Sequence, residues 1–409
     1  MIPRHSLPFG VRDVLSMMVR RVPTVVSSDF ERACAERLEA REVILLPSVR
    51  AGIHMAIEAT GKSVLVTAPA YTCEAVHEAL ALSGARTRLI DSGPDTFLTA
   101  PDGILAATEP GCALVLSEVY GIPYDKERLQ KGCSKGPRVR ILDMAMTIPS
   151  AERVQQLEAG DVALFSFGWG KPMYAGWGGI ACLQDRELAG RVRGLRNRWG
   201  SLESFRLRFR HGCSILCKVA MNGRRLYGIS HEPHLYRLYQ FLASSGNGRR
   251  PASAAGRSGG PSASGRAIQA FPPEWTRPTT ALNRKLALHN LHHSVQNADL
   301  RRSQSEVYFR LLVEPGIVRG PGGSTLPQSH FPVRFPSAVR DRMCDYLRSR
   351  GIDTSTLFPL APGLSRERYP HAAEAADEVV TLPLGPTLTL DEVQTISRYV
   401  KEGLRTMGL

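Results

Sequence analysis

The chain has 409 residues, 43% of them hydrophobic, which suits a globular protein with one large and one smaller domain. The formal net charge is +14, but the basic residues are scattered and no block of about five consecutive charges occurs, which favours a solvated basic surface over a nucleic-acid-binding face. The N-terminal stretch MIPRHSLPFG has no apolar core and no run of about eighteen apolar residues follows, so we expect neither export nor a membrane span.

The cysteines do not have the dense, regular spacing of a secreted disulfide scaffold. Several, such as Cys112 and Cys182, lie inside apolar runs, where a thiol packs as a small hydrophobic group. We therefore expect reduced thiols and a cytoplasmic location.

Residues 1–30 form an N-terminal segment with a weak amphipathic pattern at 11–19. From residue 43 onward, short apolar runs alternate with helical patterns. Strands are expected at 43–47, 63–69, 87–91, 113–119, 139–145 and 162–167, with helices at 50–60, 73–84 and 104–108. This alternation predicts an α/β fold whose large domain, residues 31–242, contains a mostly parallel sheet covered on both faces.

The composition changes sharply at residue 243. Residues 243–270 are rich in Gly, Ser, Ala and Arg, which predicts a low-complexity, flexible insertion. Residues 271–409 then read as a helical connection, of one long helix or two shorter ones, followed by a small C-terminal α+β domain. That domain has a strand at 331–335 and a capped helix beginning at 389.

Ligands of open parallel sheets gather at the carboxyl ends of the strands. The polar and small residues that follow the expected strands are therefore candidates for one site. They are Ser48, Arg50, Pro69, Tyr71, Thr72, Cys73, Glu118, Tyr120, Asp143, Ser166 and Lys171.

Lys171 stands out within the stretch GDVALFSFGWGKPMYAGWGG, residues 160–179. An apolar strand opens there into a glycine-rich turn that carries a single lysine. Burial of a lone amine favours its neutral, nucleophilic form, which is what Schiff-base chemistry requires.

Several motifs together resemble the DegT/DnrJ/EryC1/StrS aminotransferase family. They are Ser48-Val49-Arg50 at a helix start, PAYTC after the next strand, Asp143 at a strand end, FSFGWGK followed by Gly178 and Gly179, and the C-terminal TLPLGPTLTLDEV. The resemblance covers nearly the whole chain. It implies a pyridoxal 5′-phosphate (PLP) enzyme of fold type I, working as a homodimer, that transfers an amino group to a nucleotide-linked keto sugar or another carbonyl intermediate.

The resemblance also implies a role for each matched residue. Lys171 would bond the cofactor aldehyde and later carry a proton, and Asp143 would pair with the pyridine nitrogen. Ser166, and the backbone amides after Ser48, including that of Val49, would bind the cofactor phosphate.

Three positions depart from the family pattern. Where many relatives have Ser-Gly-Thr, this chain has Ser48-Val49-Arg50, so that the guanidinium either binds the phosphate or faces solvent. Cys73 occupies the place of a ring-stacking aromatic, which leaves open whether Cys73 or Tyr71 contacts the cofactor ring. Met146 replaces a Gln that hydrogen-bonds the cofactor's phenolic oxygen.

The family's dehydratases carry histidine where this chain has Lys171, so we expect an aminotransferase, with glutamate as amino donor. Met146 and Cys73 motivate an alternative, a PLP-dependent lyase or cyclase, and the net charge motivates a non-catalytic basic regulator. His289, His292 and His293, and likewise His211 with Cys213 and Cys217, are interpreted as helix surface, and no metal site is expected.

Overall fold

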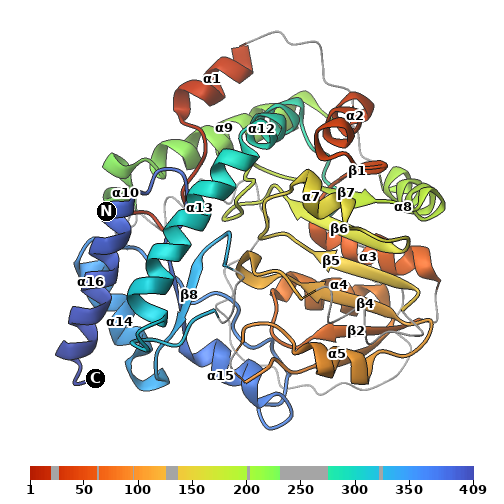
Figure 1. Cartoon of the computed structure of the whole chain (residues 1–409). Helices are drawn as coiled ribbons and strands as arrows, with labels where there is room; N and C mark the ends of the chain where they lie inside the picture. The colour runs from red at the N-terminus through yellow and green to blue at the C-terminus, as the bar shows by residue number, and fades with distance from the viewer. Residues whose placement is uncertain are drawn as a thin grey trace.

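The computed structural model describes residues 1–19, 27–61, 64–94, 96–125, 137–199, 203–230, 275–321 and 326–409. A large α/β part contains a seven-stranded sheet, and a smaller α+β part contains a two-stranded one, as Figure 1 shows. The predicted fold class is thus confirmed. The insertion predicted at 243–270 lies outside the described residues, and no helix within them is long and apolar enough to cross a membrane.

The large sheet has the strand order β1-β7-β6-β5-β4-β2-β3. Its strands are β1 (Glu42–Leu46), β2 (Leu65–Pro69), β3 (Arg86–Ile90), β4 (Ala113–Ser117), β5 (Val139–Asp143), β6 (Asp161–Ser166) and β7 (Gly179–Leu183). All neighbours are parallel except β7, which runs antiparallel to β1 and β6. Strand β7 was not predicted from the sequence. Only a glycine-rich loop separates it from β6, so the chain returns directly alongside without a crossover helix.

Helices cover both faces of this sheet, because alternate residues of each buried strand point to opposite sides. On one face, Ile44 and Leu164 pack with α3 (Val49–Thr60), α4 (Glu74–Ser83) and α8 (Arg186–Arg198). On the other, Leu45 and Phe165 pack with α2 (Ser27–Leu38), α7 (Ala151–Gln155), α9 (Phe205–Met221) and α12 (Ala281–His292). The remaining helices of this part are α1 (Val11–Val19), α5 (Pro101–Ala107) and α10 (Arg224–Ser230).

The small part packs helices around the antiparallel pair β8 (Phe331–Arg334) and β9 (Val379–Leu382). Its helices are α13 (Ser294–Tyr308), α14 (Ser337–Ser349), α15 (Pro370–Glu378) and α16 (Leu390–Thr406). The helical stretch that was predicted as one helix or two is divided at His293 into α12 and α13.

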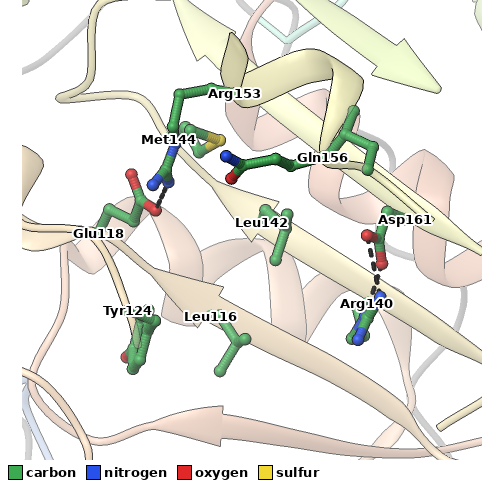
Figure 2. Close-up of a pocket in the computed structure, with 10 residues that line it drawn as sticks. Leu116, Glu118, Tyr124, Arg140, Leu142, Met144, Arg153, Gln156 and Asp161 are labelled. Atoms are coloured by element: carbon green, nitrogen blue, oxygen red, sulfur yellow. Dashed lines mark hydrogen bonds and ion pairs between the residues drawn. The ribbon is translucent and has the colours of Figure 1, made fainter. Parts of the chain in front are cut away.

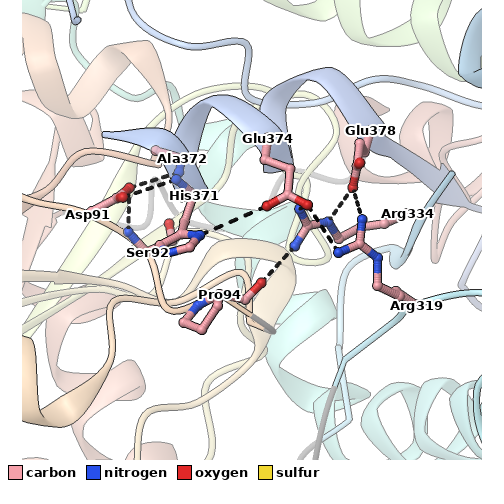
Figure 3. Close-up of polar contacts among 9 residues, drawn as sticks. All are labelled: Asp91, Ser92, Pro94, Arg319, Arg334, His371, Ala372, Glu374 and Glu378. Atoms are coloured by element: carbon pink, nitrogen blue, oxygen red, sulfur yellow. Dashed lines mark hydrogen bonds and ion pairs between the residues drawn. The ribbon is translucent and has the colours of Figure 1, made fainter. Parts of the chain in front are cut away.

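Polar contacts join the two parts, as Figure 3 shows. The carboxylate of Asp91, just after β3, accepts hydrogen bonds from the backbone N–H groups of His371 (3.0 Å) and Ala372 (2.8 Å) at the start of α15. The buried Arg334 side chain donates to the Glu378 carboxylate (3.0 Å) and to the Pro94 carbonyl (3.2 Å). Asp91 therefore caps a helix of the other part.

The first residues of the chain lie along the small part. Ile2 forms an isolated bridge with Ile352, and His5 forms one with Leu384. These bridges carry His5 to the edge of the large sheet. The amphipathic stretch at 11–19 follows as the helix α1.

Candidate active site

A cavity of about 430 Å³ opens at the carboxyl ends of the parallel strands. It brings together every candidate cofactor-binding or catalytic residue of the sequence analysis, namely Ser48, Val49, Arg50, Cys73, Asp143, Ser166 and Lys171. Thr72, Glu118 and Met146 line it too, whereas Pro69, Tyr71 and Tyr120 do not.

Lys171 lies on the loop between β6 and β7. This loop is closed by backbone hydrogen bonds from Phe167 to Gly178 (2.9 Å) and from Ala175 to Phe167 (3.0 Å). Asp143 ends β5, is 7% exposed, and accepts a hydrogen bond from the backbone N–H of Ala145 (3.2 Å). Burial raises the pKa of the Asp143 carboxyl, and the charge of Lys171 opposes that rise. The two side chains thus interact electrostatically across the cavity.

The amino end of α3 forms one wall. Ser48 is its N-cap, and its hydroxyl accepts from the N–H of Ala51 (3.1 Å), so the first amides of the helix, at Val49 and Arg50, have no intrahelical acceptor. The buried Thr72 hydroxyl has no hydrogen-bond partner among the described residues. Ser166 adds a hydroxyl that accepts from the N–H of Gly168 (3.2 Å). This wall is rich in donors and suits an anion.

Arg50 is held between two other side chains. Its Nη1 lies 2.9 Å from Oε2 of Glu78, and its guanidinium lies over the Trp275 ring, 5.4 Å from the centroid. Its Nε is buried and has no hydrogen-bond partner among the described residues. The side chain is 21% exposed, so it does not simply extend into solvent.

Cys73 and Tyr71 point in different directions. Cys73, at the N-cap of α4, lines the cavity. Tyr71 is 2% exposed, and its hydroxyl lies 2.6 Å from that of Tyr120, outside the cavity lining. Met146 presents a thioether to the cavity, where a Gln would present an amide.

Glu118 lines this cavity and also a second one of about 70 Å³. Figure 2 shows the Glu118 carboxylate pointing toward the guanidinium of Arg153, with Arg140 and Asp161 paired at the far end of the second cavity. The other carboxylate oxygen of Glu118 accepts from the Thr147 hydroxyl (2.8 Å). Burial raises the pKa of Glu118, and Arg153 opposes the rise.

Several lining residues were missed by the sequence analysis. They are His5, Trp169, Trp177, Trp275, His330, Leu357 and Phe358. The two tryptophans of the FGWGK and GWGG motifs carried a usable signal, since they flank Lys171. His5 and His330 did not, because 325 residues separate them, although His5 Nδ1 lies 3.1 Å from His330 Nε2. Burial, with Arg301 and Lys171 nearby, lowers the pKa of His330 to about 3.

The other histidine and cysteine groups lie away from this cavity. His292 and His293 are exposed at the end of α12, and the ring centroids of His289 and His293 are 4.5 Å apart. His211 is buried, and its Nδ1 lies 3.3 Å from the amide oxygen of Asn283. The prediction that His211 belongs to a helix surface was therefore wrong. Within the described residues, no group of His, Cys, Asp and Glu side chains could hold a metal ion.

Known proteins are similar to this chain in sequence or in fold. Over 387 residues the chain is 26% identical to dTDP-4-dehydro-2,3,6-trideoxy-D-glucose 4-aminotransferase of Saccharopolyspora spinosa, covering 90% of this chain and 86% of that protein. The aminotransferase TlmJ from Streptoalloteichus hindustanus superimposes with a TM-score of 0.67 at 21% identity over 100% of both chains. NtdA from Bacillus subtilis, with bound cofactor PMP, does so with a TM-score of 0.67 at 18% identity, over 97% of this chain and 82% of its own.

The sequence model of one family matches residues 17–224 and 280–401. Those two ranges contain Asp143, Lys171 and every other candidate cofactor-binding residue of the cavity. The chain therefore belongs to the DegT/DnrJ/EryC1/StrS aminotransferase family.

Proposed function

We propose that this aminotransferase uses PLP to move an amino group from glutamate to a nucleotide-linked keto sugar. The proposal rests on one observation. Lys171, Asp143 and the donor-rich N-terminus of α3 line the same cavity. The acceptor class is supported by the relative from Saccharopolyspora spinosa, whose name specifies a dTDP-linked keto sugar.

The residues present fit the cofactor. Unpartnered donors at Arg50 Nε and Thr72 Oγ1, the open amides of α3 and the Ser166 hydroxyl suit a phosphate. When bound, PLP supplies an aldehyde that bonds to amines and a pyridine ring that accepts electrons.

The chain's own groups then act on protons and charge. The Asp143 carboxylate would hold a proton on the ring nitrogen of a bound cofactor, and the nearby charge of Lys171 favours the charged form of Asp143. With the cofactor bound, the Lys171 amine would be the base that accepts the proton from the reacting carbon of the amino donor and the acid that returns it. Trp169, Trp177 and Phe358 cover the cavity with apolar surface and limit the entry of water.

Borohydride reduction of the protein loaded with PLP tests the assignment of Lys171. We expect an absorption band near roughly 400 nm before reduction and a label on Lys171 in the mass spectrum afterwards. Lys171→Ala should lose both signals. The matched control is Lys218→Ala, since that amine lies 5.7 Å from the centroid of the Trp169 ring and should be dispensable for both. Labelling elsewhere would refute the assignment.

Addition of glutamate separates transamination from the lyase or cyclase alternative. An aminotransferase loses the band and releases one 2-oxoglutarate for each cofactor. The alternative is favoured by Met146 and Cys73, which both line the cavity in place of a polar and an aromatic group. It predicts that the band persists with glutamate.

We further propose a homodimer in the cytoplasm. Phe205 and Phe209 of α9 are 77% and 63% exposed, and Leu15 and Val19 of the adjoining α1 are 45% and 80% exposed. Clustered apolar side chains of this size favour association. The cysteines that the structure describes are free thiols, which suits a reducing compartment. Light scattering on the eluted protein should give twice the chain mass, and Phe205→Asp with Phe209→Asp should reduce it.

A further inference from the structure

The small part contributes two apolar residues to the cavity, Leu357 and Phe358. They lie on the segment between α14 and α15, which is fixed at one end by the hydrogen bond from the N–H of Thr381 to the carbonyl of Ser355 (2.8 Å). At the other end, Asp91 caps α15, as Figure 3 shows. The cofactor-binding candidates, by contrast, all belong to the large part, so this wall is free to serve another ligand.

Phe358 is held in an unfavourable backbone conformation. Its φ of 63° lies in the left-handed region, and so does the φ of 60° at Tyr120. The two rings are in contact, with centroids 5.2 Å apart, and the Tyr71 ring meets Phe358 edge-on at 6.1 Å. Residues with a Cβ adopt this region only when their surroundings enforce it, and such residues cluster at functional sites.

The hydroxyl groups of Tyr71 and Tyr120 contact the backbone of Leu357, the residue before Phe358. The Tyr71 and Tyr120 oxygens are 2.6 Å apart, and they lie 3.5 Å and 3.4 Å from the carbonyl oxygen of Leu357. One hydroxyl therefore donates to the other, and the second proton goes to that carbonyl. Burial raises the pKa of both tyrosines, so both are protonated donors at neutral pH.

We propose that Phe358 determines which carbonyl acceptors fit the cavity, and that Tyr71 and Tyr120 are positioning residues that act through it. This inference rests on the proposed function for the identity of the reaction. Phe358 is 8% exposed and is part of the cavity wall, so the orientation of its side chain limits the space left in the cavity. A single methylene too many in an apolar pocket alters discrimination by about 10-fold to 200-fold.

Hydrogen–deuterium exchange on the PLP-loaded protein tests the positioning role without any acceptor. Tyr71→Phe and Tyr120→Phe each remove one proton from the pair, and we expect the peptide spanning 355–364 to exchange about tenfold faster in either variant. Tyr308→Phe is the matched control, because the Tyr308 hydroxyl is also buried and donates to a carbonyl, that of Pro383 at 3.2 Å, away from the cavity. Unchanged exchange in both test variants would overturn the positioning role.

Steady-state kinetics test the specificity role. The two acceptors are dTDP-4-dehydro-2,3,6-trideoxy-D-glucose and the bulkier sugar that retains the hydroxyl groups at carbons 2 and 3. Phe358→Ala should shift the ratio of kcat/KM by about tenfold toward the bulkier acceptor. Tyr120→Phe should shift it in the same direction by less, through KM. In the Tyr120→Phe variant, whose altered residue does not line the cavity, the rate of the half-reaction with glutamate and the affinity for PLP should stay at the wild-type values.

The outcomes distinguish this inference from the function on which it rests. A wild-type protein that reacts with glutamate, together with a Phe358→Ala variant of unaltered acceptor preference, would overturn the inference alone. A wild-type protein that does not react with glutamate would overturn the proposed function. If the wild type reacts with glutamate but uses neither sugar, the specificity role falls with the acceptor class, and the exchange experiment still decides the positioning role.

Discussion

Removal of the Arg50 guanidinium should weaken the binding of PLP but not of pyridoxal, which lacks the phosphate. Arg50 lines the cavity and has a buried, unpartnered Nε, while its Nη1 pairs with Glu78. A hydrogen bond to a charged group contributes about 1.5–3 kcal/mol. Because the side chain is 21% exposed, the lower end applies. A loss of about 1.5 kcal/mol corresponds to an approximately tenfold higher Kd.

Absorbance titration of the cofactor-free protein with each ligand measures this difference. Arg50→Gln should raise the Kd for PLP about tenfold and leave the Kd for pyridoxal unchanged. Arg193→Gln is the control, since Arg193 also pairs with a glutamate, Glu42 at 3.0 Å, but does not line the cavity. An equal loss for both ligands would show that Arg50 supports the site without contacting the phosphate. If the Kd rises for neither ligand, Arg50 has no role in binding PLP or pyridoxal.

Three further changes have expected outcomes. Asp143→Asn should slow the half-reaction with glutamate, followed by stopped-flow absorbance, about 100-fold while the band near roughly 400 nm remains, because the charge opposite the ring nitrogen is lost. Burial depresses the folded-state pKa of His330 to about 3, so the unfolded chain takes up a proton first as the pH falls. The free energy of unfolding in urea should therefore drop between about pH 6.5 and 4.5, by about 2–3 kcal/mol, and His330→Gln should reduce the drop. Asp91→Ala should lower that free energy by about 1–2 kcal/mol at pH 7, through loss of the cap on α15.

The sequence identified the residues whose position follows from a strand end. Ser48, Asp143 and Ser166 each end or follow a buried strand, and parallel pairing brings such positions to one edge of the sheet. The sequence alone could not decide whether Tyr71 or Cys73 lies at the site. Both come after β2, and only the turn into α4 directs the thiol into the cavity and the tyrosine ring toward the small part.

The residues that the sequence did not reveal come from elements placed by tertiary packing. His5 reaches the cavity because the N-terminal segment pairs with the small part, and Phe358 reaches it through a backbone conformation that no local pattern predicts. The antiparallel β7 was missed for a related reason, since a short apolar run after two glycines resembles a loop until its neighbours are known.

The charges at the sheet edge explain how two buried carboxylates coexist there. Glu118 and Asp143 follow adjoining strands, and the charge of Asp143 raises the pKa of Glu118. Both oxygens of Glu118 are already engaged, one by Arg153 and one by the Thr147 hydroxyl. The Asp143 carboxylate accepts one hydrogen bond from a backbone N–H, and it interacts with the charge of Lys171. Arg153 therefore offsets the charge of Glu118, and under the proposed function the charge of Asp143 is left to act on the cofactor.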